Sequence, residues 1–217
     1  MFQSLFSWWK EDILLKKALE ESALALEKAG NMVSFAVSVL LEGGKEEKKI
    51  YEMDQEVNIL QRNVRKKVLE HLAIHPKQDI TASLVLTTIV VDIERIGDFA
   101  KNIVELHKMF QGEPKDSEYR PNVENIIQKL TRLLKETKEA FSKADSEKAK
   151  KLMEEYTWTG RECDRSLESL VSNDSLKVRE AVAYGLLFRY LKRISAHGRN
   201  ISSSLVNPFD RLGFKPE

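Results

Sequence analysis

Hydrophobic residues recur every three or four positions along most of this chain, which is the spacing of one face of an α-helix. The clearest apolar stripe lies within residues 85–103 and consists of Val85, Ile89, Ile96, Phe99 and Ile103. No stretch alternates apolar and polar residues for long enough to indicate a β-strand. The pattern therefore predicts an all-α protein.

Glycine, proline and capping residues divide this pattern into six helices. The predicted helices span about residues 11–42, 45–72, 76–112, 121–143, 146–172 and 175–207. Gly43 and Gly44 separate the first two helices, Pro76 opens the third, and Asp145 or Ser146 caps the fifth. Because short connections make consecutive helices antiparallel neighbours, we expect two tandem antiparallel three-helix bundles, similar to spectrin repeats.

The chain also carries an internal repeat. The stretch 92–103 has an altered copy at 190–201, in which four residues match in order: Arg95, Ile96, Asn102 and Ile103 correspond to Arg193, Ile194, Asn200 and Ile201. Between the two copies, residues 112–121 are polar and include two prolines, as is typical of a boundary. We therefore expect a first repeat at 1–112, a linker at 113–121 and a second repeat at 122–217.

Acidic residues form a candidate site in the first repeat. Glu94 and Asp98 are four residues apart, so they project from one side of the third helix, away from the apolar stripe. Asp54 and Asn58 form a similar polar stripe on the second helix, and antiparallel packing would bring the two stripes into one groove. Clustered carboxylates repel unless they are protonated, solvated or bridged by a cation. An all-oxygen set suits magnesium, calcium, manganese or iron, although a solvated charged face is the commoner meaning of such residues.

The second repeat lacks this acidic pair. Lys192 and Ala196 occupy the positions that match Glu94 and Asp98, while the fifth helix keeps the acids Asp164 and Glu168. We expect Lys192 to pair with Asp164 or Glu168, because an ammonium can neutralise acids that a metal would otherwise bridge. No metal site equivalent to that of the first repeat is expected here.

Composition narrows the classes of function. The chain has 217 residues, 42% hydrophobic and 32% charged, with a net charge of +1, so no basic field indicates nucleic-acid binding. Cys163 is the single cysteine, which indicates a reducing compartment. No apolar run approaches the ~20 residues of a membrane span, and the N-terminus does not read as a signal peptide. We expect a cytoplasmic protein.

Several other residues have both a structural and a functional interpretation. Residues 2–13 form an amphipathic segment that packs on its own chain or a second copy, or else contacts a membrane surface or a partner. His71 and His75 have a metal-compatible spacing, but a role at the C-terminal end of their helix is favoured. Asp92 projects toward the apolar side, with Arg95 or a backbone group as its expected partner.

No catalytic constellation is apparent in the sequence. His197 matches Phe99 of the first repeat and is expected to pack, and Cys163 is expected to be a small buried residue. There is no Glu-x-x-His pair, no zinc-protease motif, no glycine-rich phosphate loop and no nucleophile elbow. We therefore expect a protein that is not an enzyme.

The stretch Asp92-Ile93-Glu94-Arg95-Ile96-Gly97-Asp98, followed by Asn102-Ile103, resembles the signature of the PhoU family of phosphate-signalling proteins. Asp54 and Asn58 also resemble the second helix of that family. The resemblance implies two tandem PhoU repeats in a cytoplasmic protein, usually a homodimer. It also implies a metal ion (iron, zinc, manganese, magnesium or calcium) at Glu94 and Asp98, with Asp54 as the partner from the second helix.

The same resemblance implies a function. PhoU proteins are negative regulators of phosphate uptake that contact a phosphate transporter at the membrane and, in many bacteria, a sensor histidine kinase. Two alternatives remain open: a metal-free helical adaptor, and a hydrolase or oxidase that uses a metal held by the carboxylate groove.

Overall fold

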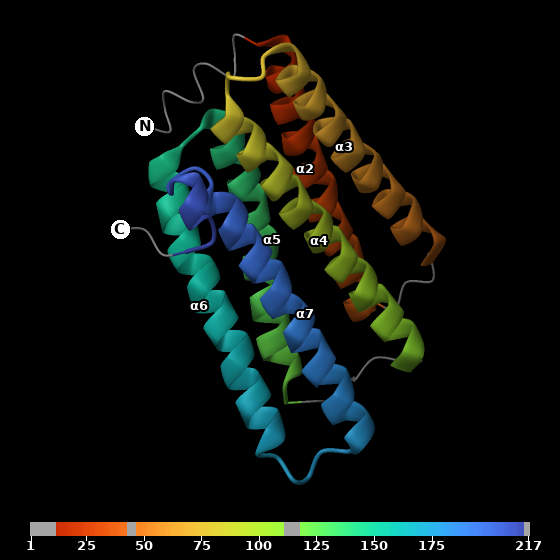
Figure 1. The fold of residues 1–217 in the computed structure, drawn as a ribbon. Coiled ribbons are helices and arrows are strands. Elements are labelled where there is room, and N and C mark those ends of the chain that lie inside the picture. The colour runs from red at the N-terminus through yellow and green to blue at the C-terminus, as the bar shows by residue number, and fades with distance from the viewer. Residues whose placement is uncertain (1–11, 43–46, 111–117, 215–217) are drawn as a thin grey trace.

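The computed structural model of the chain describes residues 12–42, 47–110 and 118–214. This part folds into six long helices and one short 3-10 helix, without a strand (Figure 1). The elements are α2 (Ile13–Glu42), α3 (Glu47–Ile74), α4 (Ile80–Phe110), α5 (Arg120–Lys143), α6 (Ser146–Val171), α7 (Val178–Ser203) and η1 (Phe209–Arg211). The predicted all-α class is confirmed.

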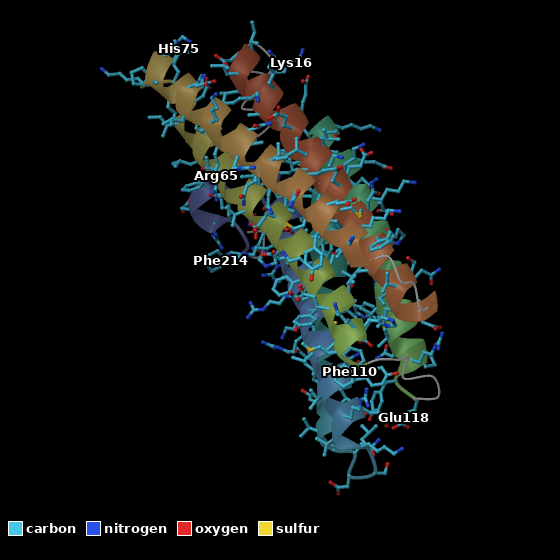
Figure 2. The ribbon with its side chains drawn as sticks, turned by 90° about the vertical axis from the view of Figure 1, so that its right-hand side faces the viewer. Lys16, Arg65, His75, Phe110, Glu118 and Phe214 are labelled. Atoms are coloured by element: carbon cyan, nitrogen blue, oxygen red, sulfur yellow. The ribbon has the colours of Figure 1, made fainter. Side chains whose placement is uncertain are left out.

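The helices form two antiparallel three-helix bundles that pack against each other. α2, α3 and α4 contact one another in the first bundle, and α5, α6 and α7 do so in the second. α4 packs on α7 and α2 packs on α5, so that α3 and α6 lie on opposite flanks (Figure 1). Figure 2 shows Lys16 and His75 at one end of the molecule and Phe110 and Glu118 toward the other, as antiparallel helices require. A single apolar cluster runs through both bundles.

The contact between α4 and α7 is reciprocal, as expected for two related repeats. Phe99 and His197 occupy matched positions of the repeats, and their rings stack at 5.8 Å between centroids. Asp92 contacts His197, and the matched residue Tyr190 contacts Phe99. Each contact is therefore the counterpart of the other, which is the signature of a two-fold relation between the bundles.

Local structure corrects several predicted boundaries. α4 begins at Ile80 rather than near Pro76, because the chain turns through residues 76–79 and Asp79 has a φ of 51°. α7 ends at Ser203, short of residue 207. The Asn207 side chain donates hydrogen bonds to the carbonyls of Arg211 and Phe214, which holds the chain in a turn after the helix.

The expected linker at 113–121 is also shorter at its C-terminal side, since α5 begins at Arg120. Its residues 113–117 lie outside the described part of the chain. The predicted cap of the fifth helix is confirmed as Asp145, whose side chain accepts a hydrogen bond from the Lys148 amide at 2.9 Å.

One described helix is long and apolar enough to cross a membrane by length and composition alone, over Ile13–Leu41. The buried core helix of a folded protein can have the same length and composition. α2 contacts α3, α4 and α5, and packing of its apolar face into the core accounts for its composition. The amphipathic segment 2–13 lies outside the described residues except for Asp12 and Ile13.

Close packing of α6 on α7 depends on Gly198. A Cβ atom at this position would lie 2.4 Å from the ring of Tyr156. Tyr156 is fully buried, and its hydroxyl is 2.9 Å from the Thr137 hydroxyl, so the ring cannot easily move away. A side chain at position 198 must therefore push the two helices apart.

Replacing Gly198 with alanine should destabilise the protein by about 2 kcal/mol, which is typical of overpacking a filled core. Gly185 is a matched control, because it lies in the same helix and a Cβ atom there would meet no neighbouring atom within 4 Å. Gly185→Ala should be neutral or stabilising by up to ~1 kcal/mol. Urea unfolding monitored by circular dichroism checks both; equal midpoints for the two variants would contradict the packing described here.

Candidate functional site

The polar stripes of α3 and α4 meet where these two helices pack side by side, and this contact zone is the groove that the spacing predicted. The ammonium of Lys101 lies between them, with Nζ 3.1 Å from Asp54 Oδ1 on α3 and 3.0 Å from Asp98 Oδ1 on α4. Nearby, the Tyr51 hydroxyl donates a hydrogen bond to Glu105 at 3.0 Å, which also joins α3 to α4. The groove therefore brings Asp54 and Asp98 together, but around a lysine.

Arg95 supplies a second positive charge at the edge of the groove. Its Nη1 is 3.1 Å from Asp98 Oδ2, and its Nε is 3.8 Å from Glu94 Oε2. The side chains of Asp54, Glu94 and Asp98 retain exposures of 15%, 18% and 25%. The expectation that the acids point freely away from the core is thus only partly met, because α3 packs beside them and covers part of each carboxylate.

Glu94 is the least compensated acid of the groove. Burial raises the pKa of its carboxyl, and the nearby charges of Asp98 and Asp54 raise it further, against the opposing effect of Arg95 and Lys101. For Lys101, burial lowers the pKa, but hydrogen bonds to Asp98 and Asp54 outweigh it and the net direction is upward. Three carboxylates therefore face two cations, and the surplus negative charge lies on the side of Glu94.

The donor set tests whether a metal ion fits. Asp54 and Asp98 each already form an ion pair with the ammonium of Lys101, and a metal ion beside that ammonium would be repelled by it. Among the described residues, no group of three or more histidine, cysteine, aspartate or glutamate side chains is arranged to hold a metal. The geometry therefore does not support Asp54, Glu94 and Asp98 as a ready metal site.

Sequence reasoning missed Lys101. A signal was present, because residues three apart on a helix are neighbours and Lys101 follows Asp98 at that spacing. The reach of the same lysine across to Asp54 is a property of the packed pair of helices and not of either helix alone.

The matching groove of the second repeat is neutralised as predicted. Lys192 Nζ lies 2.5 Å and 2.7 Å from the two carboxylate oxygens of Asp164 on α6. Glu168, the other predicted partner, is exposed. Arg199, which matches Lys101, turns instead toward the C-terminal segment and donates to the carbonyl of Gly213 at 2.9 Å.

Asp92 is structural, but its partners differ from the expected ones. Its Oδ1 lies 2.6 Å from His197 Nδ1 and accepts a hydrogen bond from Asn200 at 3.1 Å, so both partners come from α7 rather than from Arg95. The carboxylate is therefore satisfied across the seam between the repeats. The expectation that His197 packs is confirmed by its stacking on Phe99.

His71 lies in the last turn of α3, as predicted, but it has neighbours beyond its own helix. It is fully buried, with Nδ1 3.1 Å from Asp12 Oδ2 and Nε2 3.6 Å from Asp79 Oδ2. Asp12 caps α2 through the amides of Leu14 and Leu15, and Asp79 precedes α4. His71 thus faces the starts of two neighbouring helices of its bundle.

Cys163 is buried, as predicted, and burial raises the pKa of its thiol to about 12. The thiolate form needed for nucleophilic attack is therefore strongly disfavoured near neutral pH. Among the described residues, His197 is hydrogen-bonded to Asp92, and no histidine side chain is hydrogen-bonded to a serine, threonine or cysteine side chain.

These features define an all-helical protein of two three-helix repeats, with a charged groove on the outer face of the first. Residues 23–106 match the family model described as the PhoU domain. The first repeat therefore carries a PhoU domain, and the curated relatives and solved structures that align with most of the chain are PhoU proteins.

Curated relatives align with most of the chain. A protein of Pseudomonas putida is 24% identical over 80% of this chain and 70% of its own length, and one of Clostridium acetobutylicum is 22% identical over 89% and 93%. Both are named phosphate-specific transport system accessory protein PhoU homolog.

Solved structures show the same fold. PhoU from Pseudomonas aeruginosa superposes with a TM-score of 0.81 at 22% identity, over 89% of this chain and 95% of that one. The phosphate transport system regulatory protein PhoU from Streptococcus pneumoniae superposes with a TM-score of 0.73 at 17% identity, over 93% and 95%.

The raised pKa of Glu94 makes a prediction about stability. In the folded state this carboxyl keeps its proton to a higher pH than its ordinary pKa of 4.5 allows. The folded state therefore loses stability as the pH rises from the ordinary pKa through the raised pKa of the folded state. Glu94→Gln should therefore raise the unfolding temperature at about pH 7 and change it little at about pH 3.5, where the native carboxyl is protonated in both states.

Thermal unfolding in buffer containing EDTA measures this difference without interference from metal ions. Glu154→Gln serves as the control, since it removes an exposed carboxylate of α6 outside the groove. If Glu94→Gln raised the unfolding temperature equally at both pH values, the charge at position 94 would not be the cause of the increase.

Proposed function

We propose that this protein is a cytoplasmic accessory regulator of phosphate transport that acts by protein contact and not by catalysis. The observation that carries the proposal is the PhoU domain at residues 23–106, together with relatives that are named accessory proteins of a phosphate-specific transport system. The partner is a component of a phosphate transporter, and a sensor histidine kinase is a second partner of the same regulation. The chain works as a homodimer in this proposal.

The groove is where we place the contact. Glu94 and Asp98 do not serve the apolar core, and their carboxylates retain access to solvent. The surplus negative charge near Glu94 favours a basic side chain of the partner over an acidic one. The first repeat therefore offers the partner an acidic surface, whereas Lys192 neutralises the corresponding place in the second.

Metal binding in this groove is a competition between two cations. A divalent or trivalent cation reaches the oxygens of Asp54 and Asp98 only by displacing the ammonium of Lys101. Regulation by contact does not depend on that exchange, because Glu94 keeps its unbalanced charge in the lysine-bridged groove.

Deleting the gene in its host tests the function. In phosphate-rich medium, loss of a negative regulator should raise phosphate uptake and the expression of phosphate-starvation genes, and wild-type protein supplied in trans should restore both. A tagged copy should recover a transporter component from detergent-solubilised membranes. Unchanged uptake and expression, with no transporter component recovered, would contradict the proposal and favour a helical adaptor with another role.

The double variant Glu94→Ala with Asp98→Ala tests the place of the contact. It should fold with native helicity but recover less of the transporter component and fail to restore normal uptake. Glu154→Ala with Glu168→Ala is the matched control, since it removes two exposed carboxylates from α6. Equal complementation by both double variants would place the contact elsewhere.

A direct assay separates the enzymatic alternative. Purified protein incubated with manganese and a set of phosphoesters should release no phosphate above the level of the Asp98→Ala variant. Turnover that depends on Asp98 would instead identify a metal-dependent hydrolase.

A further inference from the structure

Both repeats place a lysine ammonium between or against carboxylates of their last two helices. In the first repeat Lys101 of α4 bridges Asp54 and Asp98, at 3.1 Å and 3.0 Å. In the second repeat Lys192 of α7 contacts both oxygens of Asp164, at 2.5 Å and 2.7 Å. The two ion pairs thus occupy related grooves, between α3 and α4 and between α6 and α7.

The two lysines do not occupy matched positions of the repeat. Lys192 stands where the first repeat has Glu94, whereas Lys101 matches Arg199, which contacts Gly213 instead. A shared ancestral lysine therefore does not account for both contacts. In the first repeat, partly buried carboxylates that face one another require a nearby positive charge, whereas in the second repeat the lysine pairs with the carboxylate of Asp164 alone. The two lysines come from different turns of the last helix.

We propose that Lys101 is the resident cation of the first repeat and takes the place of a metal ion there, as Lys192 does in the second. An ammonium donates hydrogen bonds to oxygens that a metal would need as ligands, and its charge repels a second cation at the same place. The wild-type groove consequently has a low affinity for divalent ions, although its three acids would otherwise suit them.

Cation binding in the groove is independent of the role in phosphate transport. The protein can regulate by protein contact even if Lys101 is not the resident cation of the groove, which is the lysine assignment. Equally, Lys101 can be the resident cation in a protein with another role. The two are therefore tested by separate measurements: uptake and pull-down for the first, and metal binding by purified protein for the second.

Titration with Mn²⁺, with the free ion followed by electron paramagnetic resonance, tests the lysine assignment. Lys101→Met keeps most of the side-chain length but removes the charge, and it should bind one Mn²⁺ about tenfold more tightly than wild type, or tighter still. Adding Asp54→Asn to this variant should abolish the gain, because it removes a carboxylate of the groove. Wild-type protein purified without chelator should contain well below one metal ion per chain.

Two further variants separate charge from structure. Lys101→Arg keeps the positive charge and should show no gain in Mn²⁺ affinity. A gain in this variant would instead indicate that any loosening of the groove improves metal binding. Lys66→Met removes one charge from a lysine of α3 that is 76% exposed, and it should also leave the affinity unchanged. Far-ultraviolet circular dichroism verifies that each variant keeps its helices.

The second repeat provides an internal comparison. Lys192→Met removes the corresponding ammonium but leaves Asp164 without a second carboxylate from α7, because Ala196 supplies no oxygen. This variant should gain no Mn²⁺ affinity. The lysine assignment is overturned if Lys101→Met binds Mn²⁺ no more tightly than wild type, if Lys101→Arg gains as much as Lys101→Met, or if wild type retains a metal ion that Asp98→Ala loses.

Discussion

The packing of α4 against α7 is the constraint on which the rest of the structure depends. Each of these helices contacts three other long helices, so most of its circumference is committed to packing. The seam between them is partly polar, and the carboxylate of Asp92 is satisfied by His197 and Asn200 of the other repeat. A largely buried carboxylate without such partners would be destabilising, which ties the relative position of the two bundles to this contact.

The groove follows from that arrangement. Because α7 covers one side of α4 and α2 covers another, Glu94 and Asp98 face the remaining neighbour, α3, with part of each carboxylate still in water. Acids in this position are neither solvated surface charges nor core residues. Partial burial makes their mutual repulsion matter, and a cation held between the helices relieves it.

The two repeats show different electrostatic solutions on one scaffold. The first keeps three acids together with Lys101 and Arg95, and burial of Glu94, followed by the charges of Asp98 and Asp54, raises the pKa of its carboxyl. The second has lost the acidic pair of its last helix, and one lysine suffices for Asp164. A duplicated fold can thus present one acidic face and one neutral face.

The amino-acid pattern alone determined the helical class, the six long helices of the described residues and the expectation that Lys192 pairs with an acid of the fifth helix, either Asp164 or Glu168. Helical periodicity and capping are local properties, and the internal repeat supplied the correspondence between matched side chains. The tertiary structure decided which partner each polar residue has. Asp92 reaches His197 across 105 residues of chain, and Lys101 reaches Asp54 on a neighbouring helix. Such contacts depend on how the helices are rotated and packed against one another. The sequence of one helix alone does not specify that packing.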